Sequence, residues 1–385
     1  MLGINSNINS LVAQQNLNGS QNALSQAITR LSSGKRINSA ADDAAGLAIS
    51  TRMQTQINGL NQGVSNANDG VSMIQTASSA LSSLTNSLQR IRQLAVQAST
   101  GTMSSTDQAA LQQEVSQQIQ EVNRIASQTT YNGTNILNGN AGIVSFQVGA
   151  NVGQTISLDL SQSMSAAQIG GGLVQKGQTV GTVTNLSLDN TGVYTSSGAA
   201  ITAINVLSDG KGGYTFTDQN GGAISQTVAQ TVFGASATSG TGAAVGALAL
   251  SASAASAGNT SAAALTAINN AIAQINAVNK PATVSGLDIS TVSGANVAMV
   301  SIDNALQTVN NVQAQLGAAQ NRFTAIATSQ QAESTDLSSA QSQITDANFA
   351  QETANMSKNQ VLQQAGISVL AQANSLPQQV LKLLQ

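Results

Sequence analysis

The chain has 385 residues, of which 41% are hydrophobic, 8% charged and 2% aromatic. This length exceeds what one hydrophobic core usually serves, so we expect two or more domains. The sequence contains no Cys and no His, which excludes thiol nucleophiles, imidazole bases and nearly all transition-metal sites, and we expect no cofactor. Because the net charge is only -3 and the basic residues are scattered, nothing indicates a nucleic-acid partner.

The sequence also argues against targeting and membrane segments. The first cationic residue is Arg30, so the N-terminal residues lack the basic and apolar regions of a cleaved secretory signal. No run of about 18 apolar residues indicates a membrane span. We therefore expect neither a cleaved leader nor a membrane partner.

Apolar residues of the segment 44–99 recur at alternating steps of four and three, which indicates the seam of a coiled-coil helix. A phase slip is predicted near Ser78. The predicted seam consists of Met53, Ile57, Leu60, Val64, Ala67, Val71 and Ile74, followed by Leu81, Leu84, Leu88, Ile91, Ala95 and Ala98. Glycines in or beside helical sequence, each expected to cost about 1 kcal/mol relative to Ala, are Gly34, Gly46, Gly59, Gly63 and Gly70.

A second helix and a hairpin are predicted to follow. Ser105 and Gln108 are spaced as a capping box, which indicates a helix start. Apolar and polar residues then alternate in two short runs separated by Gly149 and Gly153, which is typical of a β-hairpin. The inward residues are expected to be Val144, Phe146, Val148, Ile156, Leu158 and Leu160.

Residues 171–284 differ from their surroundings in being rich in Gly, Ser and Thr. Short alternating runs lie beside the turn dipeptides Asp209-Gly210 and Asn220-Gly221, which predicts a small β-rich insert domain. The expected strand residues are Ile204, Val206, Tyr214 and Phe216. An amphipathic helix around Leu265, Ile268, Ile272 and Ile275 is expected to stop before Lys280-Pro281. The low-complexity segment 235–257 permits no firm assignment.

The last hundred residues return to helical periodicity and supply the missing partner helix. Its predicted seam is Val309, Val312, Leu316, Ala319, Phe323, Ile326, Gln330, Glu333, Leu337, Ala340, Ile344 and Ala347. The polar entries Gln330 and Glu333 are expected to fix register or to mark a contact with another element. A final amphipathic stretch fills 347–385.

The predicted fold is therefore mainly α. Long helices from both chain ends form an antiparallel coiled coil, with a β-hairpin and a central β-rich (α+β) insert. The expected parts are 1–43, a terminal helix; 44–170, helices plus hairpin; 171–284, a surface-exposed insert; 285–346, the partner helix; and 347–385, a second terminal helix.

Several motifs resemble one family. LSSGKRINSAADDAAGLAIS at 31–50, NANDGVSMIQTA at 66–77 and LQRIRQLAVQ at 88–97 resemble the N-terminal part of bacterial flagellins, and YNGTNILNG and FQVGANVGQTISLDL continue the match. LGAAQNRF at 316–323, NFAQETANMSKNQVLQQAGISVLAQAN at 348–374 and LPQQVLKLLQ resemble the C-terminal part. The resemblance covers roughly 1–165 and 285–385, and none is found for the middle.

The resemblance implies a secreted, extracellular homopolymer, the filament of the bacterial flagellum. It also implies export through the flagellar type III pathway, with an export chaperone, a filament cap protein and a hook-filament junction protein as partners. The runner-up interpretations are a hook-filament junction protein and a coiled-coil surface adhesin. Adjacent Asp42 and Asp43 point about 100° apart on a helix, so a cap or interface role is favoured over acid-base catalysis, and no catalytic residue is proposed.

The terminal stretches 1–29 and 347–385 are almost uncharged and are expected to stay disordered until neighbouring copies cover them. Ordinary intramolecular packing and a membrane-surface helix are the alternatives, although few basic residues lie on the polar faces. The predicted polymerisation core is Leu11, Leu17, Leu24, Ile28, Leu31, Phe349, Met356, Leu362, Val369, Leu376, Val380 and Leu383.

A second candidate site consists of Arg90, Leu94 and Glu114. Positions 90 and 94 are one helical turn apart. The matching residues of flagellins resemble the surface recognised by Toll-like receptor 5, which implies this receptor as a partner, although Gln93 stands where many relatives carry Glu. The alternative is a solvated charged face with no partner.

Overall fold

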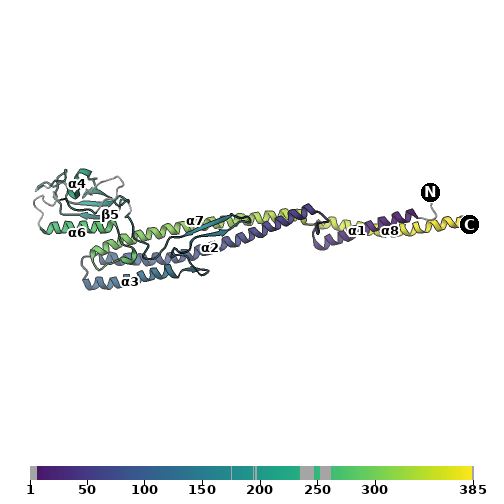
Figure 1. Cartoon of the computed structure of the whole chain (residues 1–385), viewed down its shortest axis with the longest axis horizontal. Coiled ribbons are helices and arrows are strands. Elements are labelled where there is room, and N and C mark those ends of the chain that lie inside the picture. Colours follow the sequence, from purple (N-terminus) through teal and green to yellow (C-terminus); the bar gives the residue numbers. More distant parts are fainter. Residues whose placement is uncertain are drawn as a thin grey trace. The chain divides into compact units, whose positions relative to one another are not determined.

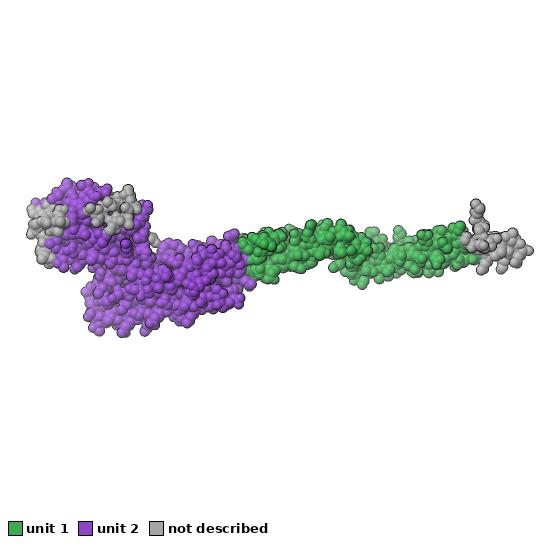
Figure 2. Space-filling model, in the orientation of Figure 1, with its two compact units in different colours: residues 1–68, 147–155, 324–385 green, residues 69–146, 156–323 purple. Residues whose placement is uncertain are grey.

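The computed structural model describes residues 7–174, 176–193, 195, 197–234, 247–251 and 262–383, except for the side chains of 262–264 and 376–383. The chain forms two compact units (Figure 2). Unit 1 comprises residues 1–68, 147–155 and 324–385, and unit 2 comprises residues 69–146 and 156–323. Two long helices, α2 (Ala44–Ala98) and α7 (Val292–Thr345), contribute to both units. Each unit therefore combines segments from several of the five predicted parts, and that division stays a prediction.

Unit 1 contains helix α1 (Ile8–Ser33) and helix α8 (Phe349–Leu383), which lie side by side and antiparallel (Figure 1). Ser10 Oγ donates a hydrogen bond to Asn374 Oδ1 over 2.7 Å near one end of the pair. Further along, a Cβ added to Gly366 would lie 3.3 Å from Leu17 Cδ1, so the two helices approach closely where one has no side chain. We call α1 and α8 together the terminal pair.

The loop after α1 ties the terminal pair to the end of α7. Gly34 ends α1 with a φ of 68°, a left-handed conformation that favours glycine. The backbone N–H of Arg36 then donates to the carbonyl of Thr345 over 2.6 Å, and Ala347 N–H donates to the carbonyl of Gly34 over 2.9 Å. Two chain segments more than three hundred residues apart are thus joined by backbone hydrogen bonds.

The adjacent carboxylates Asp42 and Asp43 have structural roles in this loop. Asp43 Oδ1 accepts from the backbone N–H of Gly46 over 2.9 Å and so caps the start of α2. Asp42 accepts from Gln26 Nε2 over 3.0 Å and from the backbone N–H of Ser39 over 3.0 Å. The hydrogen bond from Gln26, followed by those from Ser39 and Asn38, lowers the pKa of Asp42. Of the cap or interface role predicted for this dipeptide, the structure shows the cap, and it is made by Asp43.

The buried seam of α2 corrects the predicted one. Buried positions follow one another at alternating steps of three and four from Leu60 onward, so there is no phase slip near Ser78. The seam consists of Leu60, Gly63, Ala67, Gly70, Ile74, Ala77, Leu81, Leu84, Leu88, Ile91, Ala95 and Ala98. The prediction placed Val64 and Val71 in the seam, but these are only half-buried. The slip arose because glycine was not counted as a seam residue.

Glycines occupy the seam because other groups lie directly against the helix backbone there. In unit 2, a Cβ on Gly70 would lie 2.7 Å from Cε1 of Phe323, a fully buried ring on α7. In unit 1, a Cβ on Gly63 would collide with the carbonyl of Val148 and lie 2.8 Å from Gln330 Oε1. The expected helix-propensity cost of these glycines is therefore offset by close packing.

The polar residues of α7 also need one correction. Gln330 is buried beside Gly63, as expected for a contact with another element. Glu333 is exposed, and its neighbour Ser334 is buried in its place, donating from Oγ to Asn61 Oδ1 over 2.9 Å. The seam advances by four residues from Gln330 to Ser334 rather than by three.

The capping box of helix α3 (Ser105–Gln128) lies one residue earlier than predicted. The capping box is formed by Ser104 and Asp107, because the Ser104 side chain accepts from the Asp107 N–H and the Asp107 carboxylate accepts from Ser104. Gln108 is instead buried and donates from Nε2 to the carbonyl of Ala98 over 3.1 Å, closing the end of α2. In Figure 1, α3 lies beside α2 and α7.

Two hairpins follow α3. Strands β1 (Thr130–Tyr131) and β2 (Thr134–Asn135) flank a tight Asn132-Gly133 turn with positive φ at both residues, which was not predicted. Strands β3 (Gly142–Gln147) and β4 (Thr155–Leu160) form the predicted hairpin. Within unit 2, the ring of Phe146 meets that of Phe323 edge-on, with centroids 5.3 Å apart. The hairpin thus packs on the same ring that faces Gly70.

The central insert is a three-stranded antiparallel sheet with helices against it (Figure 1). Its elements are β5 (Thr179–Val183), β6 (Ile204–Ser208), β7 (Tyr214–Asp218), α4 (Gln226–Phe233) and α6 (Ala262–Asn279). The predicted strands around Val206 and Phe216 are confirmed, as is the helix ending before Pro281, whereas α4 was missed. Most of the low-complexity segment lies outside the described residues. The predicted mainly α fold class with its small sheets is confirmed.

We expect Gly70→Ala to lower the free energy of unfolding by about 1–3 kcal/mol, because the new methyl group would overlap the ring of Phe323. Gly317 in α7 is the matched control, since nothing lies within 4 Å of a Cβ added there. Gly317→Ala should raise stability by roughly 0.5–1 kcal/mol through helix propensity alone. Denaturant titration followed by circular dichroism measures both, and equal stability of the two variants would contradict the packing argument.

Candidate functional site

The terminal pair buries few of its own side chains. Its buried apolar residues are small ones, Ala13, Ala27 and Ala373. Nine large apolar side chains of the pair are between 47% and 71% exposed: Ile8, Leu11, Val12, Ile28, Phe349, Val361, Leu362, Ile367 and Val369. Scattered exposed apolar residues are ordinary, but nine within one helix pair form a candidate interaction surface.

The residues predicted as a polymerisation core are distributed over this pair. Leu11, Ile28, Phe349, Leu362 and Val369 are exposed. Leu17, Leu24, Leu31 and Met356 are half-buried. The side chains of Leu376, Val380 and Leu383 lie outside the described residues. The prediction missed Ile8, Val12, Val361 and Ile367, which a two-sided apolar pattern in each helix could have indicated.

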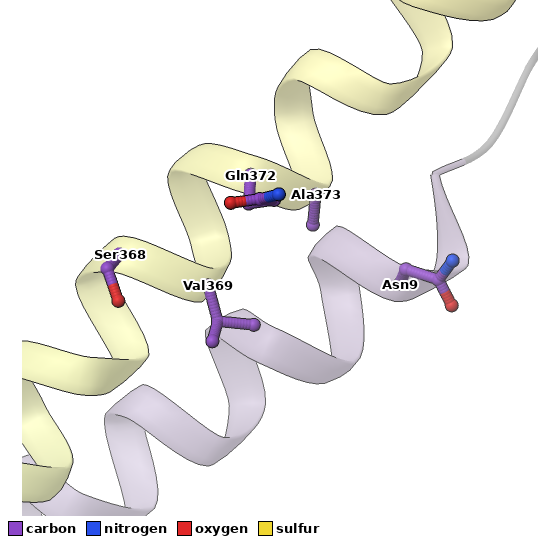
Figure 3. A pocket seen from close by; sticks show the side chains of 5 residues that line it. All are labelled: Asn9, Ser368, Val369, Gln372 and Ala373. Atoms are coloured by element: carbon purple, nitrogen blue, oxygen red, sulfur yellow. The ribbon is translucent and has the colours of Figure 1, made fainter.

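Two open recesses run along the contact of α1 with α8. The larger, of about 520 Å³, is lined mainly by small and apolar residues such as Leu17, Leu362 and Val369, together with the amides of Asn16 and Asn359. The smaller is lined by Asn9, Ser368, Val369, Gln372 and Ala373, and Figure 3 shows Val369 and Ala373 directed from α8 toward α1. The described residues that line both recesses are uncharged. Such a surface suits apolar side chains of another helix rather than acid-base chemistry.

The second candidate site lies in unit 2, where α2 and α3 meet. Arg90 Nε and Arg90 NH2 donate to Glu114 Oε1 over 2.8 Å and 2.6 Å, and the two side chains are 49% and 37% exposed. Leu94 does not join them, because it is only 1% exposed. Leu94 stands three residues after the seam residue Ile91, a spacing that could have predicted its burial. Gln93, by contrast, is exposed.

A second ion pair holds α2 on α7 nearby. Arg92 Nε donates to Asp303 Oδ1 over 2.6 Å, and Arg92 NH2 reaches Oδ2 over 3.3 Å. This hydrogen bonding, together with the charge of Asp303, raises the pKa of Arg92. Arg90 and Arg92 therefore bind carboxylates on two different helices.

None of the helices in the described ranges has the length and apolar character to cross a membrane. In the same ranges, no three acidic side chains gather in a way that could hold a metal ion. The apolar terminal pair and the charged pair on α2 and α3 therefore remain the candidate sites.

Comparison with known proteins identifies the family. Residues 4–142 match the family model described as the bacterial flagellin N-terminal helical region, and residues 299–384 match the bacterial flagellin C-terminal helical region. Residues 172–278 match the flagellin D2 domain. The middle of the chain, for which the sequence motifs gave no resemblance, is thus also a flagellin domain.

Whole-chain relatives agree with these matches. B-type flagellin of Pseudomonas aeruginosa is 35% identical over all of this chain and all of that protein. Flagellin B of Vibrio cholerae is 36% identical over all of this chain and 99% of that protein. A solved structure of FliC from Burkholderia pseudomallei is 66% identical, covers 66% of this chain and 100% of its own, and has a TM-score of 0.61.

The fold and the matches together define a structural protein of an extracellular filament. The chain belongs to the bacterial flagellin family.

The burial of Leu94 has a measurable consequence. We expect Leu94→Ala to lower the free energy of unfolding by about 2–5 kcal/mol, the usual cost of removing a buried leucine. Gln93→Ala, at the exposed neighbouring position, should change it by less than about 0.5 kcal/mol. Thermal denaturation of both variants tests this, and a wild-type midpoint for Leu94→Ala would show that the side chain is not part of the core.

Proposed function

We propose that the chain polymerises through the terminal pair into the flagellar filament and so serves motility. The observation that carries this proposal is the exposure of nine large apolar side chains on α1 and α8. Fully burying one such side chain contributes about 1.5–3 kcal/mol, so covering several of them favours association strongly. Contacts between unlike faces of successive copies generate an open helical polymer rather than a closed ring.

The same surface supports the proposed route of the subunit. A helix pair that covers so little apolar area does not offset the entropy of ordering its chain, so α1 and α8 are disordered in the free subunit and gain order on assembly. A chain with unfolded ends suits export through the flagellar type III pathway. An export chaperone would cover the C-terminal segment, and a cap protein and a hook-filament junction protein would bind the subunit at the two ends of the filament.

Removal of 347–385 separates the filament subunit from an adhesin. The truncated chain should fail to elongate sheared filaments of the full chain, because half of the terminal pair is lost. An adhesin would keep its ligand binding after this deletion and would not need to polymerise. Electron microscopy of seeded samples gives the answer, and filaments of normal length from the truncated chain would refute the proposed function.

A single substitution tests the surface itself. Leu11 is 71% exposed, so Leu11→Gln should leave the melting temperature of the free subunit unchanged. It should nevertheless raise the critical concentration for assembly roughly tenfold, since about 1.4 kcal/mol of apolar contact with a neighbour is lost. Val193→Gln, at an exposed position in the insert, is the matched control and should not change assembly. An unchanged critical concentration for Leu11→Gln would count against this surface.

We also propose that the free subunit is recognised by Toll-like receptor 5 through Arg90 and Glu114. Their mutual ion pair and their exposure support a polar contact surface on α2 and α3. Leu94 would act only by holding α2 in place, because its side chain is buried. Gln93, beside Arg90 on the exposed side, would contribute an amide in place of a carboxylate.

Arg90→Ala combined with Glu114→Ala should reduce signalling in receptor reporter cells at least about tenfold, which corresponds to about 1.4 kcal/mol. The control is Arg124→Ala combined with Glu121→Ala, which removes another exposed ion pair from the same helix α3. Signalling equal to wild type in the first variant would refute receptor binding at this site, while a loss in both variants would indicate a general charge effect.

A further inference from the structure

The terminal pair is almost devoid of charge. In residues 1–33 the sole charged side chain is Arg30, and in 349–383 the charged residues are Glu352, Lys358 and Lys382. Glu352 is therefore the single acidic residue of α8. Arg30 is thus the single charged residue of α1, and Glu352 is the single residue of α8 that carries the opposite charge.

These two residues face each other in the structure. Arg30 NH1 lies 3.5 Å from Glu352 Oε1, and their side chains are 25% and 10% exposed. On its other side, Arg30 NH2 lies 3.9 Å from Asp42 Oδ1 in the loop before α2. Because the pair is largely withdrawn from water, its attraction is screened less than that of an exposed pair, and the loss of one partner leaves a poorly solvated charge.

The remaining contacts of α1 with α8 discriminate weakly between registers. The buried apolar residues are alanines, and the close contact at Gly366 involves a single leucine, Leu17. The hydrogen bonds of Asn7 with the Ala373 carbonyl and of Ser10 with Asn374 join uncharged groups near one end of the pair, so their loss leaves no charge unpaired. Amphipathic helices repeat their apolar positions every seven residues, so a shift of one heptad places similar side chains opposite each other. Such a shift would place Arg30 opposite Asn359 or Thr345, and neither can pair with a guanidinium as a carboxylate does.

We propose that the Arg30–Glu352 ion pair fixes the antiparallel register of α1 on α8. Register decides which apolar residues of the pair stand together on its outer surface, because sliding one helix displaces its half of that surface. The inference rests on the proposed role of the terminal pair in assembly. A single buried polar contact that selects one register among apolar alternatives is the best-attested use of such groups in coiled coils.

Disulfide trapping can test the register directly, because the chain contains no Cys. Ser10→Cys with Asn374→Cys reports the native register, since these side chains are 2.7 Å apart at their polar atoms. Ser10→Cys with Ile367→Cys reports the shift of one heptad that would bring Thr345 opposite Arg30, and Leu17→Cys with Asn374→Cys reports the opposite shift, which would bring Asn359 there. Each reporter chain is assembled as a minor component with wild-type subunits on sheared filaments, and intramolecular disulfide formation is then measured on denaturing gels.

The reporters are compared in three backgrounds. The first is otherwise wild type, and the second carries Arg30→Glu. The third carries Arg30→Glu with Glu352→Arg and also Asp42→Asn, so that the reversed Glu at position 30 does not face a second carboxylate. Reversal of the exposed pair Glu121 and Arg124 on α3 serves as the control.

We expect the native-register disulfide to dominate in the wild-type and control backgrounds. Arg30→Glu should lower the ratio of native to shifted disulfide about tenfold, equivalent to about 1.4 kcal/mol, and the reversed pair should restore it. If Arg30→Glu chains fail to enter filaments at all, entry of the chains with the reversed pair supports the proposal, and failure of those chains to enter overturns it. An unchanged ratio in all backgrounds also overturns it. Failure of wild-type chains to form filaments would instead contradict the proposed function.

Discussion

Two helices packed on each other can cover only one stripe of each, and this constraint governs the terminal pair. Leu11 and Val369 stay exposed although both helices are regular, because nothing else in the described chain lies over them. In unit 2 the apolar seam of α2 is covered, because α2 there meets α7, α3 and the β3–β4 hairpin, and seam residues such as Leu84 and Ile91 are completely buried. The seam of unit 2 is thus covered within the chain, whereas the terminal pair leaves nine large apolar side chains exposed.

Much of the fold follows from periodicity in the sequence. The bounds of α2, the presence of α3 and α6, and the strands around Val206 and Phe216 agree with the expectations, because long amphipathic runs and turn dipeptides are strong signals. The errors in the α2 seam share a cause. A pattern of apolar residues assigns no place to Gly63 and Gly70, although glycine can be the seam residue wherever a ring or a backbone carbonyl comes close.

The candidate sites also could be predicted only in part from the sequence. The sequence placed Arg90 and Glu114 together correctly but also grouped Leu94 with them, although Leu94 is buried next to the seam residue Ala95. The capping box of Ser104 with Asp107 was missed because Ser105 and Gln108 have the same spacing one residue later. Contacts between distant segments, such as that of Arg30 with Glu352, leave no signal in a single sequence and require the structure.

Three loops of the insert share one pattern of internal hydrogen bonds. In each, an Asp side chain accepts from the backbone N–H groups two and four residues later, and a glycine with positive φ stands between them at the third position. The loops begin at Asp189, Asp209 and Asp218. Between Asp and Gly they carry Asn-Thr, Gly-Lys and Gln-Asn, so the same closure tolerates quite different side chains. Because the hydrogen bonds that close each loop lie within the loop itself, the side chains that the insert exposes to solvent can change without any repacking of its core.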